Sequence, residues 1–272
     1  MPSLRVAVLR ADDHHHRYLE SMLRSRFDVV FTAVEPGSAK VRRLWTRRRY
    51  RDYAYYRYHD IRRRLTGKDR YRRDYFRHDP PMYLGAADAV TVSSINDPEV
   101  STGLAQARPD VTVVIGCSIL GAKVLDTAGD RIVNVHGGHL PDYKGNHCVF
   151  FALYDGQPEK VGVSIHHVNQ GVDTGALIDV VRPPVHGGET AEQLYCRAEK
   201  LAIHRLVGLL GQLEAGVDLP AIPQPQRGRT YRTRDRGPTH DLRMWARKHG
   251  FGRASRRRTA IPGTRPAPET NA

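Results

Sequence analysis

The sequence predicts an α/β protein with a doubly wound, mostly parallel, Rossmann-like sheet. Short apolar runs rich in β-branched residues alternate with helical patterns along the chain. The first two runs, residues 4–9 and 28–34, are separated by the length of a βαβ unit. With 272 residues, of which 40% are hydrophobic, the chain can bury a substantial core. Such alternation is typical of a parallel sheet that helices cover on both faces.

The remaining elements follow in order. A helical pattern through Leu19, Met22 and Leu23 joins the first two runs. Five later runs have the length and composition of strands, namely residues 89–93, 110–115, 131–135, 161–168 and 177–181. Three helical patterns lie among them, at residues 99–107, 120–126 and 147–155. Thr190 and Gln193 form a capping-box signature before a long amphipathic helix, which Gly216 ends.

Two segments are expected to lie outside this pattern. We predict a catalytic domain over residues 1–218 with an Arg- and Tyr-rich helical insertion at about 39–78. Residues 219–272 are expected to be a short, basic, Pro/Arg-rich extension with one hairpin at 228–234 and a disordered tail after Arg253. Within the insertion, apolar side chains recur at the spacing of a helical face, namely Ala54, Tyr58, Ile61 and Leu65.

The net charge of +14 is unevenly distributed. Residues 41–80 and 227–258 each carry a net charge of +10, so the rest of the chain is mildly acidic at −6. A basic protein can bind nucleic acid by releasing counterions, and the insertion holds 7 of the 13 tyrosines, which could stack on bases. An amphipathic helix with solvated arginines explains this segment equally well. Nucleic acid therefore stays a possible partner that the sequence does not favour.

Targeting and redox signals point to a cytoplasmic protein. The chain has no run of eighteen apolar residues and no secretory signal, so we expect no membrane span. Cys117, Cys148 and Cys196 are too few and too scattered for a disulfide framework or a thiolate metal cluster. His14, His15 and His16 point in different directions on a helix, so we predict no metal site there. We expect Asp13 to cap that helix and the histidines to be solvated or to face substrate.

The most informative stretch begins with Asn134-Val135-His136 and continues through Gly137-Gly138. The two polar side chains should leave the same face at the carboxyl end of a strand, where open α/β sheets bind ligands. A glycine pair lets the backbone approach a bound molecule closely. Asp173, in a Gly-bounded loop, could return to partner the imidazole.

These residue types suit acyl transfer to an amine without a covalent enzyme intermediate. We expect Asn134 and a protonated His136 to stabilise the tetrahedral oxyanion that forms when the amine attacks a carbonyl. Asp173 would orient His136 and raise its pKa. The match of Asp173-Thr174-Gly175 to an aspartic-protease motif is weak, because such enzymes need two carboxylates that share a proton.

The sequence resembles the formyltransferase family, whose members move a formyl group from 10-formyltetrahydrofolate to an amine. Asn-x-His, LPDYKG at 140–145, GVSIH at 162–166 and GVDTG at 171–175 occur in the family's order. The resemblance implies the formyltransferase fold and places Asn134, His136 and Asp173 at the catalytic triad. It also implies that two loops cradle the folate pterin, through Ser118, Ile119, Leu120, Val168, Gly171 and Val172.

Other positions are candidates for substrate binding. Asp12 follows the first strand and could hold a substrate ammonium. Asn96 ends another strand at the same edge of the sheet. Its side chain could either cap the loop or contact substrate. Gly137, Gly138 and His139 follow the catalytic strand.

The expected activity is formyl group transfer, EC 2.1.2, to a small-molecule amine such as an amino-sugar nucleotide or a biosynthetic amino acid. The basic segments suggest that the amine arrives on an anionic carrier. Three alternatives stay open, namely a methionyl-tRNA formyltransferase-like enzyme, a formyltetrahydrofolate hydrolase and an RNA- or polyanion-binding protein on a formyltransferase core. The amine, the pathway and the oligomeric state cannot be read from the sequence.

Overall fold

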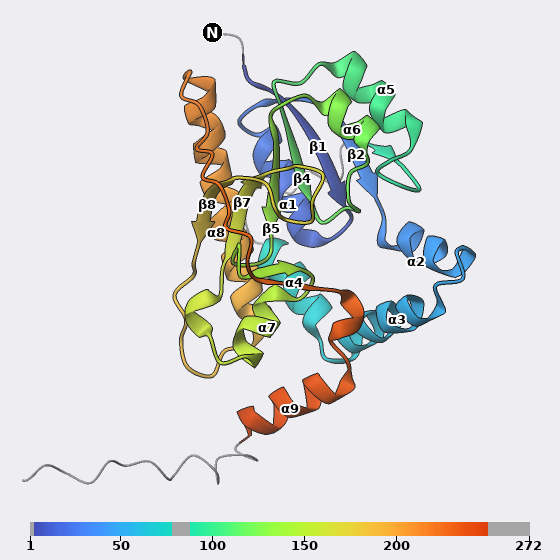
Figure 1. Ribbon diagram of the computed structural model, residues 1–272, viewed down its shortest axis with the longest axis vertical. Coiled ribbons are helices and arrows are strands. Elements are labelled where there is room, and N and C mark those ends of the chain that lie inside the picture. Colours follow the sequence, from blue (N-terminus) through green and yellow to red (C-terminus); the bar gives the residue numbers. More distant parts are fainter. Residues whose placement is uncertain (1–2, 78–87, 250–272) are drawn as a thin grey trace, which may run out of the picture. The chain divides into compact units, whose positions relative to one another are not determined.

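A mostly parallel sheet, shown in Figure 1, forms the centre of the computed structural model, which describes residues 3–77 and 88–249. Within these residues the sheet has seven strands in the order β3-β2-β1-β4-β5-β7-β8. Strands β1 to β5 are parallel, whereas β7 runs antiparallel to both β5 and β8. This confirms the predicted sheet. The bounds are β1 Arg5–Ala11, β2 Asp28–Glu35, β3 Val90–Thr91, β4 Val111–Ile115, β5 Ile132–His136, β7 Val163–His167 and β8 Leu177–Val181.

Helices cover both faces of this sheet, as expected. Helices α1 (His14–Arg24) and α8 (Ala191–Glu214) pack on one face, and α5 (Pro98–Ala107) and α6 (Ala122–Ala128) on the other. Asp13 caps α1, and the predicted capping box of Thr190 and Gln193 begins α8. The short helix α7 (Cys148–Tyr154) follows the loop after β5.

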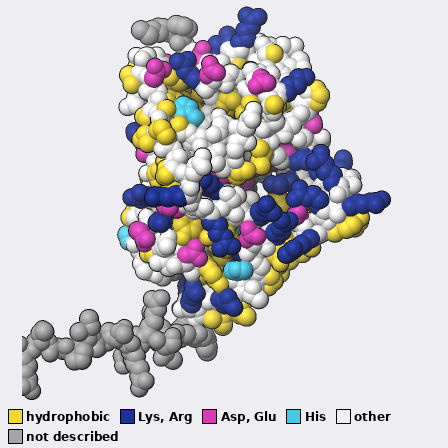
Figure 2. Space-filling model, viewed as in Figure 1, with side chains coloured by type: hydrophobic (Ala, Val, Ile, Leu, Met, Phe, Trp, Pro, Cys, Tyr) yellow, Lys and Arg dark blue, Asp and Glu magenta, His cyan; other side chains and the backbone are white. Residues whose placement is uncertain are grey.

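The insertion forms three helices, α2 (Gly37–Thr46), α3 (Tyr50–Leu65) and α4 (Lys68–Arg77). Its apolar stripe does not face the core, because Ile61 is 48% exposed and Leu65 82% exposed. The inward side of α3 instead carries buried His59, and α4 buries Phe76. Helical spacing therefore located the helix, whereas most of its apolar stripe is exposed. In Figure 2, Lys and Arg side chains gather over the region where Figure 1 places α2 and α3.

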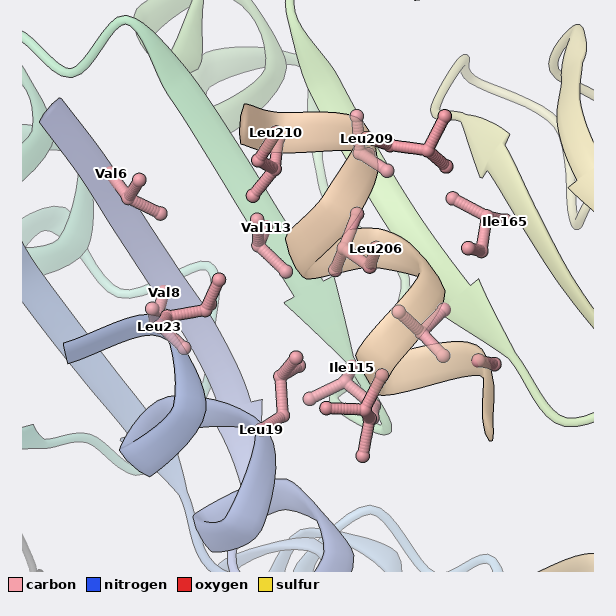
Figure 3. Packing of buried hydrophobic residues seen from close by; sticks show 14 of the residues in the cluster. Val6, Val8, Leu19, Leu23, Val113, Ile115, Ile165, Leu206, Leu209 and Leu210 are labelled. Carbon is pink, nitrogen blue, oxygen red and sulfur yellow. The ribbon is translucent and has the colours of Figure 1, made fainter. Parts of the chain in front are cut away.

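Aliphatic side chains fill the space between the sheet and α8. Figure 3 shows Val6, Val8 and Val113 of the strands packed against Leu206, Leu209 and Leu210 of α8, with Leu19 and Leu23 of α1 beside them. The opposite face has a separate cluster that includes Leu9, Leu104, Leu120 and Val124. Because alternate residues of each strand enter the two clusters, the carboxyl ends of β1, β4 and β5 are held in a fixed register.

The C-terminal extension differs from the expected hairpin. Strand β9 (Arg229–Tyr231) pairs in parallel with β6 (Tyr143–Gly145), and Tyr231 stacks on Phe151 of α7 with ring centroids 3.9 Å apart. The hairpin prediction was wrong because the partner strand lies far away in sequence. A first compact unit, Met1–Arg236, includes this strand and so extends past the domain boundary expected at residue 218.

The second compact unit begins at Gly237 and contains helix α9 (Pro238–Lys248). Pro238 occupies the first turn of this helix, where a missing N–H costs nothing. The tail predicted after Arg253 lies outside the described residues. No helix in the described part of the chain is long and apolar enough to span a membrane.

Candidate active site

Asn134 and His136 lie at the carboxyl end of β5, as predicted. Val133 and Val135 of the same strand enter the core under α8, so the alternating Asn134 and His136 face the other way. His136 is buried and Asn134 is half-buried. The strand thus presents an amide and an imidazole at the edge where open α/β sheets bind ligands.

Asp173 returns to this edge from the loop between β7 and β8. Its Oδ2 lies 3.4 Å from Nδ1 of His136 and accepts a 2.7 Å hydrogen bond from the N–H of Gly145. Asp173 has a φ of 52°, a left-handed conformation that is uncommon for a residue with a side chain. The structure therefore brings together the three residues expected to form the triad.

The carboxyl of Asp173 is strongly acidic. Burial raises its pKa, but His136, His166 and the N–H of Gly145 outweigh burial and lower the pKa to about 2. Asp173 is therefore an anion at neutral pH, as an orienting carboxylate must be.

The imidazole of His136 differs from the expected cation. Burial lowers its pKa, and the opposing attraction of Asp173 does not compensate. Asp173 raises the pKa of His136, as expected, but burial outweighs this effect, so the expected protonated imidazole is not favoured at neutral pH. A sequence does not reveal how deeply the ring is buried. Nε2 of His136 lies 3.0 Å from the carbonyl oxygen of Tyr143 and 3.7 Å from Sγ of Cys148.

His166 is a fourth polar residue of the site, which the sequence analysis included only as part of the GVSIH motif. Its Nδ1 lies 2.7 Å from the carbonyl oxygen of His167, so the proton resides on Nδ1. Nε2 then accepts a 3.0 Å hydrogen bond from the amide nitrogen of Asn134. The antiparallel pairing of β5 and β7 places Asn134 and His166 opposite each other. Knowledge of this strand pairing would have been needed to predict that His166 belongs to the site.

Gly137 and Gly138 separate two buried groups. A Cβ at Gly138 would lie 2.5 Å from Nε2 of His136, and one at Gly137 would lie 2.9 Å from Oε1 of Glu199. The glycines are required here by close approach to the protein's own side chains. Their expected role in approaching substrate stays a prediction.

Glu199 on α8 was missed by the sequence analysis. Its side chain is almost fully buried, and Oε2 has no hydrogen-bond partner among the described residues. Burial raises its pKa to about 7, although a hydrogen bond with Tyr195 and the charge of Arg72 oppose the shift. Tyr195 Oη also lies 3.0 Å from Nε2 of His15. A polar chain therefore lies behind the Gly137-Gly138 segment.

The two predicted folate loops pack on one apolar cluster through Leu120 and Val168. The N–H and hydroxyl of Ser118 both bond to Glu35, at 2.7 and 3.0 Å. Asn96 braces the same loop, since its amide donates to the carbonyl of Ile119 at 2.9 Å and accepts from the N–H of Gly121 at 2.6 Å.

In the second loop the side-chain oxygen of Asn169 accepts from the N–H of Gly171 at 3.0 Å and from the hydroxyl of Thr174 at 2.8 Å. Two apolar side chains of the loops are exposed, Ile119 at 63% and Val172 at 36%. Contacts of these residues with folate, and of Asn96 with substrate, stay predictions.

The acidic loop after β1 is paired with arginines. Asp12 lies 2.7 Å from Arg17, whereas Asp13 binds Arg63 and Arg72 of the insertion at 2.8 and 2.6 Å. A substrate role for Asp12 stays a prediction. His139 lies 3.6 Å from Asp142 and accepts a 2.9 Å hydrogen bond from Arg182, so its substrate role is also a prediction.

His15 and His16 of α1 are buried, which rules out the solvated alternative for these two residues, while the substrate-facing alternative stays a prediction. Their rings lie 3.9 Å apart, and Nε2 of His16 fills the space beside Gly116. Among the described residues no group of three His, Cys, Asp or Glu side chains could hold a metal ion.

The chain is similar to known proteins both in sequence and in fold. The chain is 34% identical over 123 residues to methionyl-tRNA formyltransferase of Paraburkholderia phymatum. The aligned region covers 45% of this chain and 37% of the relative. It is 36% identical over 115 residues to the Finegoldia magna enzyme of the same name, and this alignment covers 42% of this chain and 36% of that enzyme. The chain thus aligns with well under half the length of these relatives.

Two solved structures share the fold. A sugar N-formyltransferase from a Shewanella species has a TM-score of 0.58 at 13% identity and covers 90% of this chain and 87% of its own. Phosphoribosylglycinamide formyltransferase from Anaplasma phagocytophilum has a TM-score of 0.55 at 21% identity, and the match covers 85% of this chain and 98% of that enzyme. A family model described as "Formyl transferase" matches residues 65–210, more than half of the chain and including the triad. The chain therefore belongs to the formyl transferase family.

Proposed function

We propose that this protein is an N-formyltransferase that moves a formyl group from 10-formyltetrahydrofolate to the amine of a small molecule. The observation that carries the proposal is the convergence of Asn134, His136 and Asp173 at the carboxyl end of β5. Membership of the formyl transferase family supports the reaction class.

The three side chains have distinct tasks. One amide N–H of Asn134 donates to His166, which leaves the second to donate to the formyl oxygen as it gains negative charge. His136, neutral because burial lowers its pKa, holds its proton on Nδ1 toward Asp173 and accepts the proton of the attacking amine at Nε2, which turns from the carbonyl oxygen of Tyr143 that it faces at 3.0 Å. It returns this proton to the donor nitrogen as the old C–N bond breaks. Asp173, anionic at neutral pH, orients the ring and stabilises the resulting imidazolium.

The two loops fit a donor with a flat ring system. Exposed Ile119 and Val172 provide apolar surface, and Leu120 and Val168 anchor their loops in one cluster. When bound, 10-formyltetrahydrofolate supplies the formyl group. Asn96 holds the first loop in shape through two hydrogen bonds, so we assign it a supporting role there.

The acceptor is proposed to be an amino-sugar nucleotide or a biosynthetic amino acid. A panel of such amines with 10-formyltetrahydrofolate, read by mass spectrometry, tests this. We expect a formylated product whose formation depends on the amine and collapses in His136→Ala and Asp173→Asn. Equal donor consumption without any amine would instead identify a hydrolase, in which water replaces the amine.

Methionyl-tRNA is a second candidate acceptor. The curated relatives that align with this chain at 34–36% identity carry that activity in their names, and the net charge of +14 suits a polyanion. Charged initiator tRNA therefore belongs in the panel. Formylation of the tRNA but of none of the small amines would replace our first candidate.

A further inference from the structure

Glu35 connects the end of β2 to the first of the two predicted folate loops, the one that follows β4. It is the last residue of β2, and its side chain is only 3% exposed. Strand β1 lies between β2 and β4, so Glu35 reaches across the end of β1 to the loop. There Oε2 accepts from the N–H of Ser118 at 2.7 Å, and Oε1 accepts from its hydroxyl at 3.0 Å. These two bonds hold both the backbone and the side chain of Ser118.

The insertion supplies the positive charge that faces this carboxylate. Arg43 lies in the last turn of α2, and its Nη2 donates to Oε1 of Glu35 and, at 3.1 Å, to the hydroxyl oxygen of Ser118. A buried carboxylate is costly unless it is paired and hydrogen-bonded, so Arg43 and Ser118 together stabilise Glu35 where it lies. Each of the three side chains thus contacts the other two. We call Glu35, Arg43 and Ser118 the loop clamp.

The first loop is held on both sides of Ile119. The loop clamp holds Ser118 on one side, and Asn96 binds the carbonyl of Ile119 and the N–H of Gly121 on the other. The side chain of Ile119 stays 63% exposed. A loop whose shape is set in advance loses less conformational freedom when a ligand binds. The contacts therefore present an apolar side chain from a loop that is already ordered.

We propose that Glu35 and Arg43 are positioning residues that hold the first loop in the shape that binds the formyl donor. Ser118 donates both its N–H and its hydroxyl to Glu35, so it acts as the anchor of the loop, and Ile119 is the side chain that meets the donor. The inference rests on the proposed function, because it gives the insertion a part in donor binding. Donor affinity then depends on α2, which contributes no residue to the triad.

The loop clamp can be tested by binding of tetrahydrofolate, without formyl group or amine. Anaerobic calorimetric titration gives the Kd for wild type, Glu35→Gln and Arg43→Gln. Each variant should raise the Kd by about 10-fold, the usual effect of losing a charge-assisted hydrogen bond. The double variant should bind about as weakly as the weaker single variant, because the two side chains act through one shared contact. Arg43 is 21% exposed, so Arg43→Gln should fold even if Glu35→Gln does not.

Matched variants separate the clamp from a general effect of charge. Arg42→Gln removes the same charge from an exposed position of the same helix and should bind tetrahydrofolate as wild type does. Arg43→Lys should recover much of the affinity. Nη1 of Arg43 has no hydrogen-bond partner among the described residues, so the single nitrogen of lysine can keep the contact that Nη2 makes.

Two further measurements distinguish positioning from loss of folded protein. In transfer assays the KM for the donor should rise much more than kcat falls, whereas a smaller folded fraction would lower kcat alone. Amide hydrogen exchange, measured by NMR without donor, should be faster at Ser118 in Glu35→Gln and Arg43→Gln than in wild type or Arg42→Gln.

Equal affinity for tetrahydrofolate in wild type, Glu35→Gln and Arg43→Gln would overturn the proposal and leave the proposed function standing. The proposal is also overturned if Arg42→Gln binds as weakly as Arg43→Gln. A wild-type protein that binds no tetrahydrofolate, although Glu35→Gln accelerates exchange at Ser118, would instead contradict the proposed function, while the hold of the insertion on the loop would stand.

Discussion

Two buried carboxyl groups lie on opposite sides of the Gly137-Gly138 segment, and they differ in acidity. Asp173 is surrounded by His136, His166 and the N–H of Gly145, and its pKa is about 2. Glu199 has a hydrogen bond to Tyr195 but one oxygen without a partner among the described residues, and its pKa is about 7. Burial raises the pKa of both, so the donors and cations around each carboxyl decide its charge.

The contrast shows how one short segment separates an anionic site from a protonatable one. On the β5 side, a permanent carboxylate can stabilise a transient imidazolium. On the α8 side, a carboxyl that changes charge near neutral pH lies beside the charged pair of Arg72 and Asp13. The following predictions test whether these two environments are as different as the structure indicates.

The largest effect is expected at the imidazole itself. His136→Ala should lower the formyl transfer rate by about 10²- to 10³-fold, because both proton transfer and charge stabilisation are lost. His186→Ala, at an exposed histidine, is the control and should retain the wild-type rate. Steady-state kinetics with circular dichroism of each variant provide the measurement. A retained rate in His136→Ala would remove this residue from the mechanism.

The next effect is an opposite pH dependence of stability at the two carboxyls. Asp173 has a lowered pKa, so its contribution of roughly 2 kcal/mol is present above the unfolded value of about 3.8 and is lost as pH falls towards 2. Asp173→Asn should therefore destabilise the protein at pH 7. Denaturant unfolding from pH 7 down to the acid limit of the fold measures this.

Glu199 has a raised pKa, so the folded state binds its proton more tightly than the unfolded state does. Its contribution is present below the unfolded value of about 4.5 and is lost as pH rises through 7, a change of roughly 3 kcal/mol. Relative to wild type, Glu199→Gln should be more stable at pH 8 than at pH 5. The same stability difference at both pH values would show that Glu199 titrates normally.

Replacing Gly137 or Gly138 by alanine should affect the Glu199 side and the His136 side of the segment differently. Gly138→Ala places Cβ against His136 and the backbone of Tyr143, so we expect a cost of about 1–3 kcal/mol and a marked loss of turnover. Gly137→Ala meets Tyr195 and Glu199, so it should mainly change stability and its pH dependence. Gly187→Ala has open space around its Cβ and should change neither.

The smallest effect concerns the insertion. Leu65 is 82% exposed, so Leu65→Gln should change the free energy of unfolding by less than about 0.5 kcal/mol. Thermal unfolding of the variant is sufficient to check this. A loss of several kcal/mol would mean that the apolar stripe of α3 is covered after all.

Much of the fold could be predicted because it depends on local patterns. The strand runs, the capping boxes and the helix of the insertion follow from periodicity and from residues close in sequence. The expected hairpin was wrong because β9 pairs with β6, and the spacing pattern of α3 did not show that His59 is its buried residue. In both cases the partner lies far along the chain, where local patterns carry no information.

Local patterns in the sequence were sufficient to predict the sheet and to place two of the three candidate triad residues, Asn134 and His136, at the end of β5. The tertiary structure decided how deeply His136 is buried, that His166 orients Asn134, and that Glu199 lies behind Gly137. It also decided where the basic insertion meets the first loop, through the contacts of Arg43 with Glu35 and Ser118. Charges and hydrogen-bond partners depend on the distance and burial of groups remote in sequence, and only the packed fold sets these.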